Sequence, residues 1–347
     1  MKTKLLPALL AGAVLFPGLA GARDLTIVSW GGVFQEAQRK VFIAPFQAES
    51  GIPVAEDSWD GGIGVMRTKA QVGAANTWDL VQVEGDEELI GCEEGIYELI
   101  DIERLGGADA FVPGSVTDCG VPANVYAMAM AYDGAKLGAG APQTWADFWN
   151  VEKFPGKRAM RQGPKMNLEF ALMADGVAKD DVYGVLATPE GIDRAFRKLD
   201  ELKPHIIWWT SGNQPMQLLT SGEVAMTTTY HTRVRGVNLS EGRDIRLSYD
   251  GAMFLIDSWV IMKGSPNVEA AYAFLAYQAQ ADVQAKWPEQ LGSGVGTAAA
   301  QALIDAELAP TLPSDPANMA KELPLDVGFW ITHIDDLSAR FASWSGQ

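Results

Sequence analysis

Aromatic and charged side chains follow the short apolar runs of this chain in which strands are expected. They are Trp30, Trp59, Tyr126, Trp208, Trp209, Tyr230 and Trp259, together with Glu84, Asp86, Arg233 and Asp257. An aromatic face attracts an ammonium group by about 0.5 to 2 kcal/mol when water is excluded. Each tryptophan taken alone could equally pack in the core, but their clustering with carboxylates predicts a receptor for a small amine.

The familiar signatures of catalysis and of metal or nucleotide binding do not occur in the sequence. The three histidines, His205, His231 and His333, are far apart and form no HExxH motif. Gly156 and Lys157 are followed by arginine rather than Ser or Thr, which excludes a P-loop, and there is no GxSxG motif. We therefore expect binding without turnover, with no cofactor and no metal.

The first part of the chain predicts the elements that must position Trp30 and Glu84. Apolar spacing indicates strand, helix, strand, helix and strand over residues 25–29, 34–50, 53–57, 63–72 and 79–83. Gly51 ends the first helix as a left-handed cap would. This order is typical of a parallel sheet with helices on its faces, and such sheets bind ligands beyond the carboxyl ends of their strands. Trp30 and Glu84 follow the first and third strands.

The remaining elements place the other candidate residues. Val121–Asp133 is an apolar segment that we expect to be extended and to cross between two lobes, and Thr188 and Pro189 cap an amphipathic helix. Val224–Tyr230 is an expected strand. The apolar run Ala252–Met262 contains Asp257, and an acid inside a buried strand needs a partner.

Length and charge limit the classes of protein. A chain of 347 residues is longer than one hydrophobic core usually supports, so two lobes are expected. The net charge of −17 argues against nucleic acid or an anionic membrane as the main partner. Lys2 and Lys4, the apolar run that follows them and the small residues up to Ala22 predict a cleavable secretory signal over residues 1–22, the alternative being an uncleaved anchor.

Export changes the interpretation of the two cysteines. In an oxidising compartment Cys92 and Cys119 are expected to form a disulfide, with free thiols as the alternative. A structural zinc site is disfavoured because two cysteines without a neighbouring histidine lack two of the four ligands.

The ordered segments of the chain resemble the periplasmic binding proteins of polyamine importers, the spermidine/putrescine type within the extracellular solute-binding family. The segments are IVSWGG (27–32), WDLVQVEGDEEL (78–89), VPANVYAMAMAYD (121–133), WADFW (145–149), KPHIIWWTSGNQ (203–214), LLTSGEVAMTTTY (218–230) and DGAMFLIDSWVIMKG (250–264). The resemblance implies an α/β fold of the type II periplasmic binding protein class, with a ligand cleft at the hinge. We expect one lobe over 23–127 and 256–305 and the other over 128–255 and 306–347. The resemblance also implies delivery to an inner-membrane ABC permease. With the signal segment we expect a periplasmic location, and we expect a monomer.

The resemblance also implies the residues of the site. It places the ligand aromatics at Trp30 and Tyr230, a residue after the third strand at Glu84, a serine at Ser211, and the acid that holds an amine at Asp257. Glu169 matches another family acid only loosely.

One position departs from the polyamine pattern and changes the expected ligand. Polyamine binders carry a second acid three residues after the strand-closing aromatic, and this chain has Arg233 there. A guanidinium would repel a dication but fits a carboxylate with two parallel hydrogen bonds. Asp257 and Arg233 together therefore predict an ω-amino acid such as 4-aminobutyrate.

The sequence is compatible with several alternatives. Arg233 could pair with Asp257 or Glu84 beside a neutral or singly cationic ligand, and a polyamine could bind between Asp257 and Glu84 or Asp86. A ferric-ion receptor is disfavoured because the chain has no adjacent tyrosine pair. An interaction protein without a ligand would have no pocket.

Overall fold

The computed structural model describes residues 23–73 and 77–346, so the expected signal peptide over 1–22 lies outside the described residues. The strands are β1 Leu25–Ser29, β2 Val54–Ser58, β3 Leu80–Glu84, β4 Gly120–Asp133, β5 Lys157–Arg161, β6 Ile206–Trp209, β7 Val224–Tyr230, β8 Ile245–Ile261 and β9 Leu323–Pro324. They form one mixed sheet in the order β2-β1-β3-β8-β4-β7-β5-β6, with β9 beside β8. The expected α/β class is therefore confirmed.

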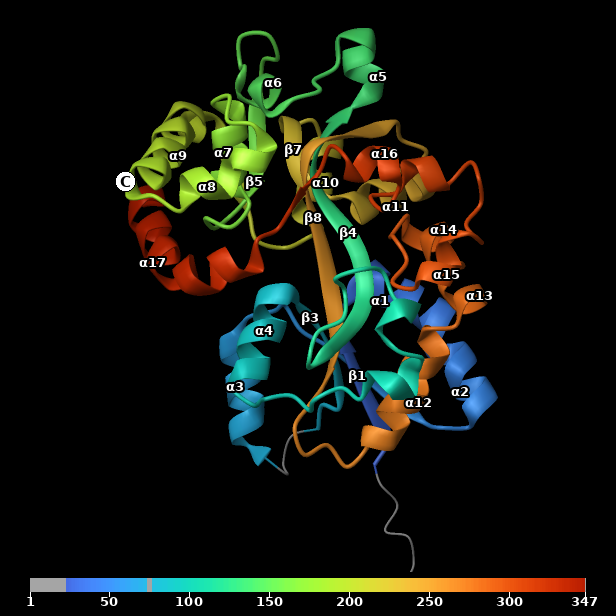
Figure 1. Ribbon diagram of the computed structural model, residues 1–347. Helices are drawn as coiled ribbons and strands as arrows, with labels where there is room; N and C mark the ends of the chain where they lie inside the picture. Colours follow the sequence, from blue (N-terminus) through green and yellow to red (C-terminus); the bar gives the residue numbers. More distant parts are fainter. Residues whose placement is uncertain (1–22, 74–76, 347) are drawn as a thin grey trace, which may run out of the picture.

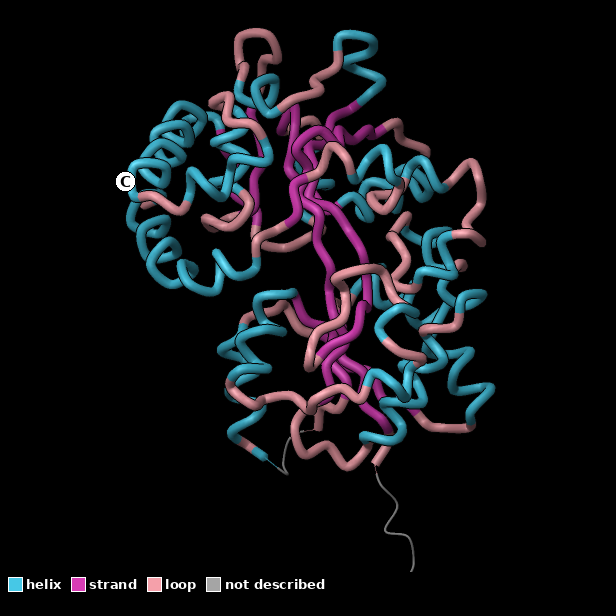
Figure 2. Tube along the Cα trace, viewed as in Figure 1, coloured by secondary structure: helices cyan, strands magenta, loops and turns pink. Residues whose placement is uncertain are grey.

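Helices lie on both sides of the strands along the length of the molecule (Figure 2). In the first half of the chain they are α1 Gly32–Gln38, the π-helical turn η1 Arg39–Ile43, α2 Ala44–Ser50, α3 Ile63–Gln71, α4 Gly85–Glu93, α5 Gly134–Leu137, α6 Trp145–Trp149 and α7 Asn167–Ala174. In the second half they are α8 Val182–Leu186, α9 Pro189–Leu202, α10 Gln214–Thr220, α11 His231–Glu241, α12 Val268–Gln278, α13 Ala281–Gln284, α14 Trp287–Leu291, α15 Ala298–Gln301, α16 Pro316–Met319 and α17 Val327–Ser345. In the described part of the chain, none of the helices is long and apolar enough to cross a membrane.

The parallel pairing expected near the start of the chain is present, because β1 pairs in parallel with both β2 and β3. The helix expected over 34–50 is continuous but contains the π-helical turn η1. Pro45 follows this turn. Proline lacks the amide hydrogen and its ring clashes with the preceding turn of an α-helix, which the wider turn relieves. Gly51 ends α2 with φ of 71°, the left-handed cap expected.

Two long strands connect the ends of the molecule. β4 and β8 pair antiparallel over most of their length, with irregular steps between Pro122 and Asn124 and between Met128 and Met130. In Figure 1 they run from the group that holds β1, β3, α1–α4 and α12 to the group that holds β5, β7 and α6–α11. β4 confirms the extended segment expected over Val121–Asp133.

The buried apolar side chains form separate clusters at the two ends of these strands. One large cluster includes Phe148, Phe170, Trp209, Leu199 and Trp330. At the other end of β4 and β8, clusters on two sides of the sheet include residues of β1, β3, α1, α2 and α12. α17 belongs to the first cluster through its buried side chains.

Candidate ligand site

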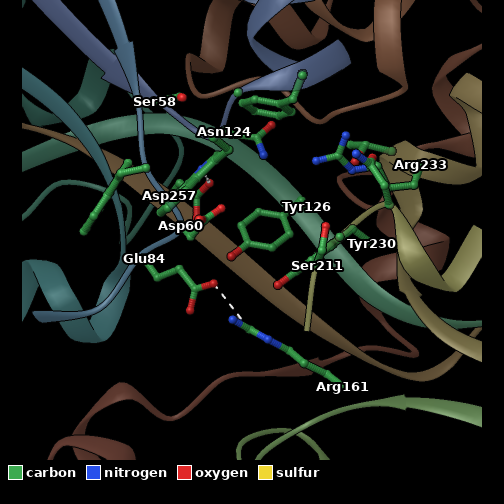
Figure 3. A pocket seen from close by; sticks show the side chains of 18 of the residues that line it. Ser58, Asp60, Glu84, Asn124, Tyr126, Arg161, Ser211, Tyr230, Arg233 and Asp257 are labelled. Atoms are coloured by element: carbon green, nitrogen blue, oxygen red, sulfur yellow. Dashed lines mark hydrogen bonds and ion pairs between the residues drawn. The ribbon is translucent and has the colours of Figure 1, made fainter. Parts of the chain in front are cut away.

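A cavity of about 560 Å³ lies beside the long strands β4 and β8, and residues from both groups of elements line it. It is lined by all six residues predicted for the site, Trp30, Glu84, Ser211, Tyr230, Arg233 and Asp257. Figure 3 shows Asp257 and Glu84 on one side of Tyr126 and Arg233 on the other. The carboxyl ends of β1, β3, β6 and β7 all supply lining residues, as expected for strands of a parallel arrangement.

Asp257 is a buried acid with one unused oxygen. It lies in β8 directly opposite Glu84 of β3 and Asn124 of β4. Its Oδ2 accepts hydrogen bonds from Trp30 Nε1 at 2.8 Å and Gln82 Nε2 at 2.7 Å, whereas Oδ1 accepts none from the described residues.

Burial makes ionisation of Asp257 costly in the empty protein. Burial first, and the charge of Glu84 second, raise the pKa of Asp257 to about 7, against the opposing effect of hydrogen bonding from Trp30, Gln82 and Tyr126. A cation placed against Oδ1 would favour the ionised form. This carboxylate therefore has both a vacant acceptor and an electrostatic need for a positive charge.

Glu84 also lines the cavity, but protein cations already occupy its oxygens. Lys165 Nζ lies 2.6 Å from Oε2, and Arg161 approaches Oε1 at 3.5 Å. Lys165 also contacts both oxygens of Asp86 at 3.0 Å. Although burial opposes the charge, Lys165 and then Arg161 bring the pKa of Glu84 down to about 2. Glu84 is therefore ionised and neutralised internally.

Arg233 provides an opposite charge without a protein partner. It lies in the first turn of α11, which begins directly after β7. The structure gives its guanidinium no hydrogen bond or ion pair with any described residue, and its NH1 nitrogen is buried. Burial lowers the pKa of Arg233. The alternative in which Arg233 pairs with Asp257 or Glu84 is therefore not found among the described residues.

Aromatic rings line the space between these charges. Trp30 stacks on Trp59 with ring centroids 5.3 Å apart and planes 13° from parallel. Tyr230 contacts Tyr126 and Trp209, with centroids 5.7 and 6.0 Å away. Because the Trp30 indole N–H is used by Asp257, a single residue both fixes the acid and presents an aromatic surface to the cavity.

Ser211 lies in the loop between β6 and α10. Its backbone N–H donates to Gln214 Oε1 at 2.9 Å, as does that of Thr210 at 2.7 Å, so Gln214 fixes the turn. At the next residue, a Cβ added to Gly212 would lie 3.5 Å from Arg233 NH2. The loop therefore packs closely against the guanidinium.

Four residues highlighted by the sequence do not line the cavity. Trp259 is buried in the core beside Phe274, and Trp208 packs against the aromatic residues of α17. Asp86 does not line the cavity and accepts a hydrogen bond from Lys165 Nζ. Glu169 is buried in the core, where its Oε1 accepts from Trp330 and Tyr183. The apolar residues beside a tryptophan in the sequence are the same whether it packs in the core or lines a cavity, so the sequence could not distinguish these cases.

Four of the polar residues around the site that sequence reasoning missed act on its charges or line it. Arg161 and Asn124 line the cavity, Gln82 donates to Asp257, and Lys165 neutralises Glu84. Gln82 had a detectable signal, since a polar residue inside the apolar run of residues 79–83 needs a buried partner. Arg161 is the last residue of β5 and Lys165 follows the strand. No periodic sequence pattern there indicates which way their side chains point.

Two further expectations concern metals and cysteines. In the parts of the chain that the structure describes, no group of three or more His, Cys, Asp or Glu side chains could hold a metal ion. Cys92 and Cys119 form the predicted disulfide, with Cα atoms 5.8 Å apart, at the end of α4 and the start of β4. Both cysteines pack in the apolar cluster that includes Val81 and Val83 of β3.

Comparison with known proteins identifies the family. Residues 42–320 match the family model described as bacterial extracellular solute-binding protein. The chain is 41% identical to a gamma-aminobutyric acid-binding protein of Pseudomonas aeruginosa over 94% of this chain and 92% of that one. The solved structure of the Atu4243-GABA receptor matches with a TM-score of 0.82 and 31% identity, covering 93% of this chain and 97% of that one. The structure of MotA from Agrobacterium tumefaciens B6 with glucopine matches with a TM-score of 0.85 and 33% identity, covering 93% and 99%. The chain therefore belongs to the bacterial extracellular solute-binding proteins, and it is a binding protein rather than an enzyme.

Proposed function

We propose that this protein captures a short ω-amino acid, with 4-aminobutyrate as the favoured ligand, for an ABC importer. The single observation that carries the proposal is the pair of unpartnered opposite charges in one cavity, Asp257 Oδ1 and the Arg233 guanidinium. Asp257 would bind the ammonium group and Arg233 the carboxylate. Trp30 and Tyr230 would enclose the ammonium and the methylene chain, and Ser211 would border the carboxylate end.

The energetics favour a ligand that carries both charges. An ion buried without a partner costs several kcal/mol, so a ligand with only one charge would leave one pole of the cavity unpaired. A ligand of about seven heavy atoms, at a ceiling of roughly −1.5 kcal/mol per atom, could reach about −10 kcal/mol, or tens of nanomolar. Micromolar or tighter capture is therefore attainable.

The related proteins support the same ligand class. The Pseudomonas aeruginosa relative is a gamma-aminobutyric acid-binding protein, and the Atu4243 structure is that of a GABA receptor. The polyamine alternative is weakened by the cations on Glu84, since Lys165 and Arg161 already occupy the acid that would face a second ammonium group.

We propose that capture occurs by closure of two lobes, one over 23–127 and 256–305 and the other over 128–255 and 306–347. The separate apolar clusters at the two ends of β4 and β8 support this division. A cavity of about 560 Å³ is much larger than a ligand of seven heavy atoms. Closure would reduce this volume and exclude water from both ion pairs.

Export and delivery complete the proposal. The basic and apolar pattern of residues 1–22 supports a cleavable signal peptide and a periplasmic location. Membership of the solute-binding family supports an inner-membrane ABC permease as the partner. We propose that the receptor acts as a monomer.

Calorimetric titration of the mature protein with 4-aminobutyrate, n-butylamine and putrescine tests the proposal. We expect 4-aminobutyrate to bind at least tenfold more tightly than either of the others, because only this ligand satisfies both poles. Tighter binding of putrescine would establish the polyamine alternative instead. Absence of heat with all three ligands would refute the assignment of an ω-amino acid.

A further inference from the structure

Two carboxylates lie side by side in the middle of the sheet. Glu84 and Asp257 are direct cross-strand partners between β3 and β8. Residues in such positions have Cβ atoms about 5 Å apart, and like charges directly opposite each other are destabilising. Both side chains line the same cavity. Without compensation, the wall of the cavity would present two negative charges to a ligand.

Lys165 compensates only one of these acids. Its Nζ lies 2.6 Å from Glu84 Oε2 and 3.0 Å from both oxygens of Asp86, and the structure shows no contact between Lys165 and Asp257. The lysine side chain is only 14% exposed and does not line the cavity. It therefore shapes the electrostatic field in the cavity without touching what binds there.

We propose that Lys165 is a specificity-determining residue that sets the net charge of the ligand. It acts as a built-in ammonium group that occupies Glu84 and Asp86, leaving Asp257 as the one buried acid for a ligand cation. The inference rests on the proposed function and deepens it, since it explains why the cleft would select one ammonium group rather than two.

The charges around the cavity are balanced. At neutral pH, Glu84, Asp86 and Asp257 supply three carboxylates, because burial and the charge of Glu84 raise the pKa of the neighbouring Glu87 to about 8, while Arg161, Lys165 and Arg233 supply three cations. The further lining carboxylate, Asp60, is exposed to solvent and is therefore screened. A neutral set of buried charges suits a zwitterion with no net charge. Loss of Lys165 would leave an excess negative charge beside the ligand's ammonium group.

Lys165 differs from Arg161 in that it does not line the cavity. Arg161 lines the cavity at 3.5 Å from Glu84 and could touch a ligand directly. Lys165 makes the shorter contact and is held between two acids of the segment formed by β3 and α4. The effect of Lys165 on ligand choice is therefore electrostatic. A purely structural role would weaken the binding of all ligands alike, whereas an electrostatic role changes the preference between them.

The test compares ligand preference in the mature wild-type protein and in Lys165→Gln. Dissociation constants for 4-aminobutyrate and putrescine are measured by calorimetry at pH 7.5, where Asp257 is mostly ionised and Glu87 mostly protonated. We expect the preference for 4-aminobutyrate over putrescine to fall at least tenfold in Lys165→Gln. The variant leaves Glu84 and Asp86 without their lysine, and the added negative charge attracts both ammonium groups of putrescine but only the one of 4-aminobutyrate. An unchanged preference would overturn the proposal.

Two control variants separate charge from packing. Lys263→Gln removes a surface lysine paired with Glu98 at 2.6 Å and should leave the preference unchanged. The double variant Lys165→Gln/Asp86→Asn removes one cation and one acid, so it should restore most of the wild-type preference. A double variant that keeps the altered preference would contradict an electrostatic role.

A second variant covers the case in which Lys165→Gln does not fold. Lys165→Met keeps most of the length of the side chain without its charge and should shift the preference toward putrescine in the same direction, whereas no shift would overturn the proposal. Failure of the proposed function is distinguishable, because it appears already in the wild type as an absence of 4-aminobutyrate binding.

Discussion

Protonation of Asp257 should control ligand affinity. Its carboxyl is buried with a pKa of about 7, whereas an ammonium ligand needs the ionised form. Binding below pH 7 must therefore release a proton. With a ligand-bound pKa below 5, affinity for 4-aminobutyrate should fall about tenfold per pH unit below 7, and about a hundredfold from pH 8 to pH 5. The ligand itself keeps both charges over most of this range, since model carboxyl and amino groups titrate near about 4 and 10.

Calorimetry in buffers with different ionisation enthalpies provides the assay. At pH 6 the wild type should release about 0.9 proton on binding 4-aminobutyrate, the fraction of Asp257 protonated in the empty protein. Asp257→Asn should bind at least a hundredfold more weakly, because a broken buried ion pair costs about 3 kcal/mol or more. Its residual binding should release no proton. Asp60→Asn, which removes an exposed carboxylate from the cavity wall, should behave like the wild type. An affinity that does not change between pH 5 and pH 8 would refute the assignment of Asp257 to the ammonium group.

The same carboxyl predicts a stability effect with a defined sign. The pKa of Asp257 is about 7 in the folded empty protein and about 3.9 in an unfolded chain, so the folded state holds the proton more tightly. Its contribution to folding is therefore present below about pH 4 and is lost as the pH rises to 7, a change of about 4 kcal/mol. Glu87, Glu169 and Glu322 also have raised pKa values, so the wild type must be compared with Asp257→Asn. The empty variant should unfold at a higher temperature than the empty wild type at pH 8.

Two other changes should have distinct effects. Arg233→Gln should weaken 4-aminobutyrate binding at least tenfold by calorimetry while changing n-butylamine binding less than about threefold, because only the carboxylate loses its partner; equal losses for both ligands would remove Arg233 from the carboxylate end. Replacing Cys92 and Cys119 by serine should lower the free energy of unfolding by about 3 to 4 kcal/mol, measured by denaturant titration, because the bond closes a loop with a sequence separation of 27. Ligand affinity should be unchanged, since neither cysteine lines the cavity.

Local elements could be predicted from the sequence because their patterns are short and periodic. β1 and β7 have the expected bounds, and Thr188 caps α9 as expected by accepting from Gly191 N. β8 extends further than the apolar run that starts at Ala252, because its first part, from Ile245, mixes buried, partly buried and exposed residues and carries charge. Pairing with β4 stabilises that part, and pairing over such distances leaves no local pattern.

The six residues of the expected site lie around one cavity, but their electrostatic states could not be predicted. Glu84 and Asp257 are both acids at strand positions, yet the structure lowers the pKa of one to about 2 and raises that of the other to about 7. The difference comes from Lys165 and Arg161, which lie about 80 residues from Glu84 in sequence. Only the three-dimensional arrangement shows which acid is already neutralised.

The separation of Asp257 and Arg233 explains why a ligand should be required. Asp257 is fixed within β8 by donors from Trp30 and Gln82, while Arg233 is fixed in the first turn of α11 behind Tyr230. Closure of the two lobes would bring Arg233 toward Asp257, but Tyr126 of β4 lies between the two side chains (Figure 3). If the two groups could meet, they would neutralise each other and a ligand would have to displace an ion pair. Because Tyr126 separates them, each charge stays unpaired until a molecule with both complementary charges spans the cavity, so the distance between the two charges is the source of selectivity.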